Sequence, residues 1–347
     1  MMMNITVIGA GAWGTALAIS LSANHRVTLW ARDAVQIESM RATRRNQRYL
    51  PNISLPDNLE LSADFAAALM VAELAIIAVP THALRSTLQH LLHSRPHPFD
   101  GFRTGHFDGL RTGLGVVWLC KGFEAETSLL PHQVAVEVLP EEFHCGVLSG
   151  PSFAQEVALG LPTALTFASA DQEFAHATAQ ALHHARLRIY TSNDMVGVEV
   201  GGAVKNVLAI AAGICDGMGL GFNARAALLT RGLAEITRLG LKLGGRPETL
   251  SGLPGVGDLI LTCTGDLSRN RQVGLLLAQQ HDLPEILRRL GHVAEGVYTV
   301  REVQNIAQRL GVAMPICEAV YRIIYEHIPA QEAVAELLNR APNLEFQ

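Results

Sequence analysis

The chain has 347 residues, a formal net charge of −5 and 17% charged residues. This length exceeds the usual size of one hydrophobic core, so we expect two domains. The acidic balance and the lack of a long basic run argue against a general attraction to nucleic acid or to anionic membranes. Any anionic ligand would therefore be bound by local positive groups.

The first residues and the cysteines predict a cytoplasmic protein. Residues 1–8 have no basic region and no cleavage site of small residues, so we expect no signal peptide. No apolar run is expected to be long enough to span a bilayer. The cysteines form an odd set without close pairing, which predicts reduced thiols and no zinc site. They are Cys120, Cys145, Cys215, Cys263 and Cys317.

The first motif is a glycine-rich turn. Residues 4–8 are an apolar run, and the residues after Gly11 have the period of a helix. Gly9, Gly11 and Gly14 thus form the pattern G-x-G-x-x-G between a strand and a helix, as in dinucleotide sites. Gly9 permits the tight turn, Gly11 lets a pyrophosphate reach the backbone, and Gly14 lets the helix pack on the sheet. The free N–H groups of the helix would face the phosphates.

The end of the second predicted strand, residues 26–30, bears on the choice of cofactor. Arg32 comes first after this strand, where an arginine can accept the extra phosphate of NADP. Asp33 lies one position later than the acid that binds the ribose of NAD, and it can cap the following helix. We therefore expect an NADP-capable site without excluding NAD. The alternative is that Arg32 is a solvated turn residue.

Apolar runs predict a parallel sheet with both faces covered. With the two strands above, they indicate a Rossmann-type dinucleotide-binding domain over residues 1–192. An imperfect tandem copy within residues 93–115 predicts a long surface loop, whose histidines indicate a polar loop rather than a metal site. The further predicted strands are residues 74–79, 115–120, 144–149, 164–168 and 187–191.

Residues 193–340 predict an all-α substrate and catalytic domain. Residues 194–215 read as a buried helix that carries one lysine, Lys205, on an apolar stripe without a carboxylate. Burial would lower the pKa of this lysine and suit it to proton transfer, and Gly201 and Gly202 would leave room for a ligand. The alternative is a lysine at the edge of a core helix with its ammonium in water.

The rest of this domain is expected to be helical to about residue 339. Asn223 is predicted to cap the second helix, and residues 246–256 are predicted to form a loop. Ser268 is the natural N-cap of a helix that begins with Arg269, and this helix start can bind a phosphate. An ordinary capped helix with an exposed arginine is the alternative.

Two loops at strand ends supply further candidates. Lys121 follows the strand of residues 115–120, and ligands of open α/β sheets bind at such carboxyl ends. Gly150 and Ser152 follow the strand of residues 144–149 and offer a hydroxyl and backbone amides.

Six motifs in this order resemble the soluble bacterial NAD(P)-dependent glycerol-3-phosphate dehydrogenases over nearly the whole chain. They are the Gly9 turn, Lys121-Gly-Phe, Ser149-Gly-Pro-Ser-Phe-Ala, Lys205-Asn206, Gly257-Asp258-Leu and Ser268-Arg-Asn270. The resemblance implies reversible reduction of dihydroxyacetone phosphate to sn-glycerol 3-phosphate with NAD(P)H, which feeds glycerophospholipid synthesis. It implies Lys205 as the general acid and base, with Lys121 and Asp258 holding the reacting end of the substrate.

The same resemblance implies the binding residues. The substrate would meet Lys121, Gly150, Ser152, Lys205, Asn206, Asp258, Thr262, Ser268, Arg269 and Asn270. The dinucleotide would meet Gly9, Gly11, Ala12, Trp13, Gly14, Arg32, Lys121, Ala154, Arg269, Val293 and Glu295. Two features depart from the family pattern: the long loop before Lys121, and Ala12 where a serine is common.

Two other functions stay open at this stage. A hydroxyacid or ketopantoate-type dehydrogenase would use Arg269 for a carboxylate, and a non-catalytic dinucleotide sensor would bind the cofactor without turnover. The helical second domain favours a homodimer, and no metal, nucleic-acid partner or integral membrane association is expected.

Overall fold

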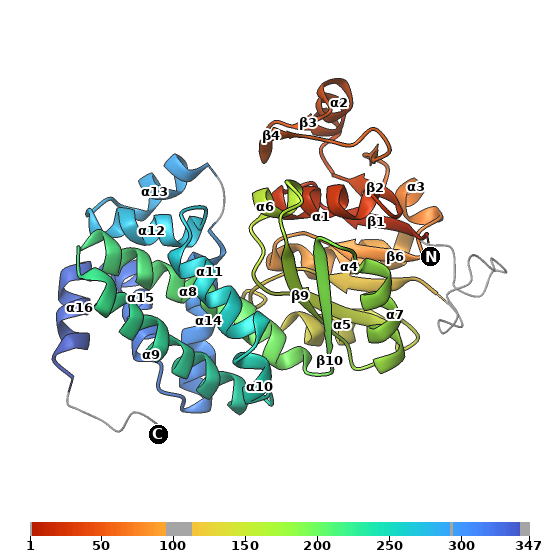
Figure 1. Ribbon diagram of the computed structural model, residues 1–347. Helices are drawn as coiled ribbons and strands as arrows, with labels where there is room; N and C mark the ends of the chain where they lie inside the picture. Colours follow the sequence, from red (N-terminus) through yellow and green to blue (C-terminus); the bar gives the residue numbers. More distant parts are fainter. Residues whose placement is uncertain (1, 95–112, 292–293, 341–347) are drawn as a thin grey trace.

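The computed structural model describes residues 2–94, 113–291 and 294–340. A sheet with helices on both faces comes first, and a group of packed helices follows it (Figure 1). This arrangement confirms the predicted fold class, an α/β Rossmann-type domain followed by an all-α C-terminal domain. Residues 95–112, which include most of the duplicated loop, lie outside the described residues.

The sheet has eight strands in the order β10-β9-β8-β7-β6-β1-β2-β5. All neighbouring pairs run parallel except β8 and β9, so the last two strands run opposite to the other six. The central strands are apolar because helices cover both faces. Their bounds are β1 Asn4–Ile8, β2 Arg26–Trp30, β5 Glu60–Ser62, β6 Leu74–Ile77, β7 Gly115–Trp118, β8 Cys145–Ser149, β9 Thr163–Ala168 and β10 Leu187–Ser192.

Two hydrophobic clusters cover the sheet, one on each face. Helices α1 (Ala12–Ser22) and α7 (Gln172–Leu182) pack on one face, and α3 (Phe65–Met70), α4 (Leu84–Ser94) and α5 (Pro131–Val138) pack on the other. A short 3-10 turn, Thr81–Ala83, precedes α4, and α6 (Ala154–Ala158) packs against α1. The carboxyl ends of β1, β6, β7 and β8 therefore share one edge, where the glycine turn and Lys121 lie.

Two parts of this domain were not predicted, the short edge strand β5 and a hairpin that precedes it in the chain. Helix α2 (Ala34–Thr43) leads into a two-stranded antiparallel sheet of β3 (Arg45–Asn46) and β4 (Leu50–Ser54). Figure 1 shows α2, β3 and β4 projecting beyond the body of the domain. Asp33 caps α2, as expected, because its carboxylate accepts hydrogen bonds from the N–H groups of Val35 and Gln36.

The helical domain surrounds one central helix, α8 (Met195–Gly217), which packs against α9, α11, α12, α14 and α15. The last strand ends at Ser192, three residues before α8 begins. The other helices are α9 Gly221–Lys242, α10 Pro247–Leu250, α11 Asp258–Thr264, α12 Arg269–Ala278, α13 Leu283–Leu290, α14 Glu295–Leu310, α15 Pro315–Tyr325 and α16 Ala330–Leu338.

Helix α8 corrects one expectation from the sequence. With 23 residues and a mean hydropathy of 1.5 it is long and apolar enough to span a membrane, whereas no such run was expected. The whole apolar window is buried inside the protein, and the helix forms the centre of the hydrophobic core. A helix that is apolar on all sides is typical of such a core position.

Two further expectations for this domain were wrong. Helix α9 begins at Gly221, so Asn223 lies inside it and does not cap it. Gly219 and Gly221 both have positive φ and turn the chain within a few residues, which starts the helix early. Residues 246–256 are not a plain loop, because they contain α10 and part of a π-helical turn, Leu253–Gly257.

Helices α8 and α12 approach each other closely, and this contact positions the part of the site at the start of α12. A Cβ at Gly213 of α8 would lie 2.0 Å from the carbonyl oxygen of Arg271, and one at Gly274 of α12 would lie 2.0 Å from that of Ile210. The two backbones therefore touch, which fixes the start of α12 beside α8.

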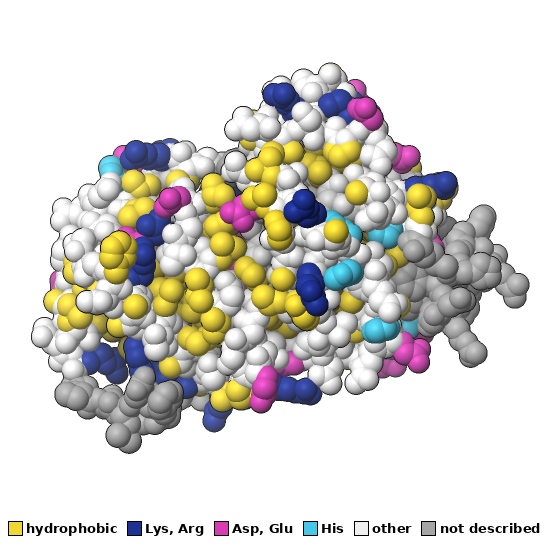
Figure 2. Space-filling view, viewed as in Figure 1, with side chains coloured by type: hydrophobic (Ala, Val, Ile, Leu, Met, Phe, Trp, Pro, Cys, Tyr) yellow, Lys and Arg dark blue, Asp and Glu magenta, His cyan; other side chains and the backbone are white. Residues whose placement is uncertain are grey.

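On the face drawn in Figure 2, lysine and arginine side chains are scattered, and apolar side chains gather across the middle.

Candidate active site between the sheet edge and the helical domain

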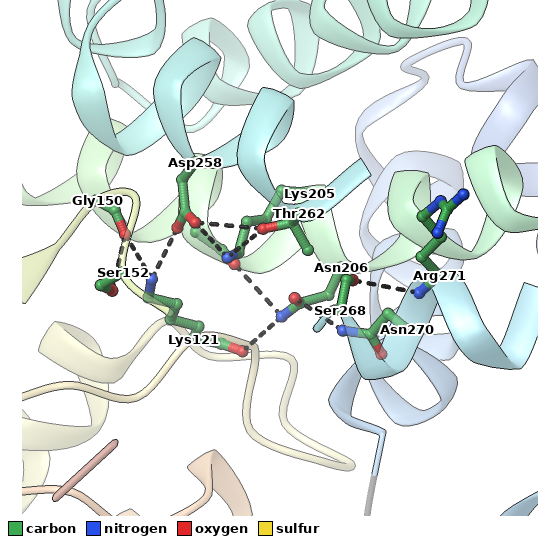
Figure 3. Close-up of polar contacts among 11 residues, drawn as sticks. Lys121, Gly150, Ser152, Lys205, Asn206, Asp258, Thr262, Ser268, Asn270 and Arg271 are labelled. Carbon is green, nitrogen blue, oxygen red and sulfur yellow. Dashed lines mark hydrogen bonds and ion pairs between the residues drawn. The ribbon is translucent and has the colours of Figure 1, made fainter. Parts of the chain in front are cut away.

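One carboxylate joins the two candidate lysines. Lys205 of α8 donates a hydrogen bond to Oδ1 of Asp258 at 2.5 Å, and Lys121 donates to Oδ2 of the same residue at 2.7 Å. Lys121 also donates to the carbonyl of Gly150 at 3.0 Å, and Lys205 to Thr262 Oγ1 at 2.8 Å. Figure 3 shows these side chains converging from the sheet edge, α8 and α11. The stripe of α8 on which Lys205 lies has no carboxylate, and α11 supplies one.

Burial governs the charge of Lys205. Its side chain is 8% exposed, and this burial lowers its pKa from 10.5 to about 8. The Asp258 carboxylate opposes the shift, while the positive charge of Lys121 adds to it. A lysine with such a pKa exchanges its proton near neutral pH. Its ammonium has three N–H donors, of which Asp258 and Thr262 take two.

The two glycines before Lys205 do not leave room for a ligand, contrary to expectation. A Cβ at Gly201 would meet the carbonyl oxygen of Pro254 at 2.7 Å, and one at Gly202 would meet Ser149 Oγ at 3.1 Å and Lys121 Cγ at 3.5 Å. Protein atoms therefore fill the space beside both glycines. They allow the π-helical turn and the stem of Lys121 to approach α8 closely.

A second set of contacts links three helices beside the lysines. The Asn270 side chain donates to Oδ1 of Asn206 at 3.0 Å and accepts from the N–H of Gly296 at 3.0 Å. Asn206 donates in turn to the backbone carbonyl of Lys121 at 3.4 Å. These amides hold α8, α12 and the start of α14 against the residue that follows β7. Figure 3 shows the contacts of Asn206 with Asn270 and Lys121.

The start of α12 carries one engaged and one free guanidinium. Ser268 caps the helix by accepting from the N–H of Arg271 at 3.3 Å, as predicted. The side chain of Arg271 forms ion pairs with Asp216 at 2.7 Å and Asp266 at 3.0 Å. Arg269 is exposed and has no hydrogen bond or ion pair within the part of the chain that the structure describes. It is the cation at this helix start that can meet an anion.

Glu295, the first residue of α14, faces this group of cations. Burial raises the pKa of its carboxyl, and the positive charges of Arg269, Lys121 and Lys205 oppose that rise. Glu295 belongs to the helical domain and is one of the residues predicted to contact the dinucleotide. Val293, which precedes it, lies outside the described residues.

The glycine turn has the geometry that a dinucleotide needs. Gly9 has a φ of +120°, and a Cβ there would meet the carbonyl oxygen of Ala78 at 2.5 Å. A Cβ at Gly14 would meet the carbonyl oxygen of Gly9 at 2.0 Å, so α1 packs tightly against the turn. At Gly11, in contrast, a Cβ would meet no atom of the described residues within 4 Å, which leaves open space beside the backbone. A pyrophosphate fits against this position and the start of α1.

The other predicted cofactor residues differ in their burial and contacts. Ala12 and Trp13 begin α1, Ala154 begins α6, and all three pack against one small hydrophobic cluster. Arg32 is exposed after β2, and the structure gives it no hydrogen bond to another described residue. Ser152 bonds only the carbonyl of Gly150, at 3.1 Å, among the described groups.

One buried acid beside the site was missed by sequence reasoning. Glu199 of α8 accepts from the indole N–H of Trp118 at 2.8 Å and from His132 Nδ1 at 2.6 Å. Burial raises the pKa of this carboxyl. Glu199 thus connects α8 to β7, the strand that leads to Lys121, and to α5, a helix of the sheet domain. An acid within an otherwise apolar helix was the signal that could have identified it.

The doubly wound sheet, its glycine turn and the lysine-bearing helix define a two-domain protein of the dinucleotide-dependent dehydrogenase type. The family model of the N-terminal part of NAD-dependent glycerol-3-phosphate dehydrogenase matches residues 4–175, and that of the C-terminal part matches residues 194–335. The chain therefore belongs to the NAD-dependent glycerol-3-phosphate dehydrogenase family.

Relatives and solved structures agree with this assignment. Glycerol-3-phosphate dehydrogenase [NAD(P)+] of Thiobacillus denitrificans is 57% identical over 344 residues, 99% of this chain and 100% of the relative. That of Nitrosomonas eutropha is 56% identical, with 99% of both chains covered. The crystal structure of the Coxiella burnetii glycerol-3-phosphate dehydrogenase is 40% identical, with a TM-score of 0.89 over 98% of this chain and 99% of that one. A ketopantoate reductase from Ralstonia eutropha shares the fold at 15% identity and a TM-score of 0.54.

Proposed function

We propose that this protein catalyses the reversible reduction of dihydroxyacetone phosphate to sn-glycerol 3-phosphate with NADPH or NADH. When bound, the reduced nicotinamide supplies the hydride, and the protein supplies orientation, charge and a proton. The observation that carries the proposal is the Asp258 carboxylate that holds Lys205 and Lys121 side by side. The relatives named for this reaction support the choice of substrate.

Lys205 is the general acid and base in this proposal. Its third N–H is directed by the two acceptors that hold the ammonium, Asp258 and Thr262, so it can reach a ketone oxygen. In the reductive direction the ammonium donates its proton to that oxygen. In the oxidative direction the neutral amine removes the proton from the hydroxyl, and the pKa of about 8 makes both forms accessible.

Lys121 and Asp258 orient the reacting end. Lys121 keeps one N–H beyond those given to Gly150 and Asp258, and its charge would polarise the ketone oxygen. The Asp258 carboxylate, which is 1% exposed, fixes both ammonium groups at once and does not itself need to exchange a proton. Asn206 holds the backbone of Lys121 in place.

The start of α12 is the proposed phosphate site. Arg269 is the free guanidinium there, and the helix N-terminus adds its unpaired N–H groups. The proposed substrate residues are Lys121, Gly150, Ser152, Lys205, Asn206, Asp258, Thr262, Ser268, Arg269 and Asn270. A phosphate at Arg269 would place the ketone of a three-carbon substrate toward the two lysines.

The glycine turn is the proposed dinucleotide site. Arg32 is exposed at the end of β2, where its guanidinium can meet the extra phosphate of NADP, while Asp33 Oδ1 is engaged in capping α2. This supports NADP use and leaves NAD possible. The proposed cofactor residues are Gly9, Gly11, Ala12, Trp13, Gly14, Arg32, Lys121, Ala154, Arg269, Val293 and Glu295.

The same proposal covers the setting of the enzyme. It acts as a homodimer in the cytoplasm on a small phosphorylated substrate, without a nucleic-acid partner, and its product feeds glycerophospholipid synthesis. The proposed domain boundary lies between residues 192 and 193. The net charge of −5 and the burial of α8 in the core support the absence of nucleic-acid and membrane partners.

Substrate comparison tests the reaction. NADPH oxidation is measured with dihydroxyacetone phosphate, with the 2-keto acid that corresponds to a 2-hydroxyacid, and with ketopantoate, all at equal concentrations. The proposal requires a preference for dihydroxyacetone phosphate, because Arg269 and the start of α12 suit a phosphate. Preference for either keto acid would contradict it, and cofactor binding without turnover of any substrate would favour the non-catalytic sensor.

A further inference from the structure

A buried amide outside the glycine motif contacts the glycine turn. The side chain of Asn46, in β3, is 0% exposed and donates hydrogen bonds to the carbonyl of Ala10 at 3.0 Å and to Thr15 Oγ1 at 2.8 Å. Gln36 of α2 donates to the same carbonyl, also at 3.0 Å. Two amide donors thus converge on the carbonyl of the peptide group that joins Ala10 to Gly11.

This carbonyl fixes the direction of a neighbouring donor. The carbonyl of Ala10 and the N–H of Gly11 belong to one peptide unit, which is planar and trans, so they point in opposite directions. The Ala10 carbonyl points toward Asn46 and Gln36, and the Gly11 N–H therefore points away from them. Beside Gly11 there is open space, and within the described residues its N–H has no acceptor.

We propose that Asn46, assisted by Gln36, is a positioning residue that aims the Gly11 N–H at the pyrophosphate of the dinucleotide. Glycines on both sides of Ala10 make this peptide unit free to rotate unless its carbonyl is held. The bond from Asn46 to Thr15 ties the same side chain to the first turns of α1, so the turn and the helix N-terminus keep one arrangement. The α2–β3–β4 projection thereby acts on cofactor binding without touching the reacting end.

The inference rests on the proposed dinucleotide site and is tested by direct binding. The Kd for NADPH is measured by fluorescence titration on the full chain, for the wild type and for Asn46→Ala and Gln36→Ala. One lost hydrogen bond of ordinary strength predicts that Asn46→Ala raises this Kd by about twofold to tenfold. Gln36→Ala is expected to raise it by about twofold, and kcat at saturating NADPH is expected to stay near the wild-type value.

Two matched variants separate positioning from stability. Asn58 donates to the carbonyl of Ser22 at 2.7 Å, at the other end of the same helix α1. Ser169 is 1% exposed and donates to the carbonyl of Cys145 at 2.6 Å, at the opposite edge of the sheet. Asn58→Ala and Ser169→Ala are expected to lower Tm and to leave the Kd for NADPH unchanged.

The outcomes decide the inference separately from the proposed function. A wild-type Kd in both Asn46→Ala and Gln36→Ala, or an equal rise in the two control variants, would overturn the positioning role. If Asn46→Ala does not fold, an unchanged Kd in Gln36→Ala is sufficient to overturn it. A wild-type protein that binds neither NADPH nor NADH would instead overturn the dinucleotide site itself.

Discussion

The pH dependence of both reaction directions gives the most detailed prediction. Lys205 has a pKa of about 8 instead of 10.5, because it is buried and lies near Lys121. A change of this size means that the site disfavours the ammonium by about 3 kcal/mol relative to water. With this pKa, about nine tenths of the enzyme carries the ammonium at pH 7 and about one tenth at pH 9.

Reduction needs the ammonium and oxidation needs the amine, so the two profiles have opposite slopes. From pH 7 to pH 9, kcat/KM for dihydroxyacetone phosphate should fall by about tenfold, while kcat/KM for glycerol 3-phosphate should rise by about tenfold. Both limbs should share one pKa near 8, measured at constant ionic strength with saturating cofactor. Asp258→Asn should move the shared pKa below 8, because the Asp258 carboxylate raises the pKa of Lys205 more than Glu295 does.

Three results would refute this reasoning. The first is a pair of limbs near 10.5, the ordinary lysine value, and the second is a flat profile in both directions. The third is a limb near 8 that persists in Lys205→Ala, because another group would then carry the proton.

Three further predictions concern binding, cofactor choice and stability. Arg269→Ala should raise KM for dihydroxyacetone phosphate by about tenfold or more with little change in Tm. Arg271→Ala breaks the ion pairs to Asp216 and Asp266 and should chiefly lower Tm. The reverse pattern would show that Arg271 binds the phosphate and Arg269 stabilises the fold. Arg32→Ala should raise KM for NADPH and leave KM for NADH nearly unchanged, and an equal effect on both cofactors would contradict the phosphate contact. Gly213→Ala should lower the free energy of unfolding, measured by urea denaturation, by about 2 kcal/mol or more, because its Cβ would meet the Arg271 carbonyl. Wild-type stability of this variant would show that α8 and α12 can separate without cost.

Local pattern was enough to predict the position of the glycine turn and the strands of the sheet other than the short edge strand β5. Continuous apolar runs such as residues 74–79 indicate covered strands, and the structure has β6 there from Leu74 to Ile77. The hairpin of β3 and β4 was missed, because its residues are mostly polar and include Pro51. Its role at the turn depends on Asn46, and the contact to Ala10 spans 36 residues of sequence.

The site was harder to predict, because its contacts join distant segments. The lack of a carboxylate near Lys205 on its own helix could be read from the spacing, but its partner Asp258 lies 53 residues later. Gly201 and Gly202 were interpreted as room for a ligand, whereas the atoms that approach them are those of Pro254, Ser149 and Lys121. A glycine indicates a close approach, and its sequence position does not say which group makes it.

The most direct test of Lys205 as the proton donor is the Lys205→Ala variant. Its kcat for dihydroxyacetone phosphate reduction should fall by about 10²-fold or more, while its Kd for NADPH stays near the wild-type value. Lys242→Ala, at an exposed lysine in the last turn of α9, serves as the control and should keep wild-type activity. An unchanged kcat in Lys205→Ala would contradict the proposed mechanism.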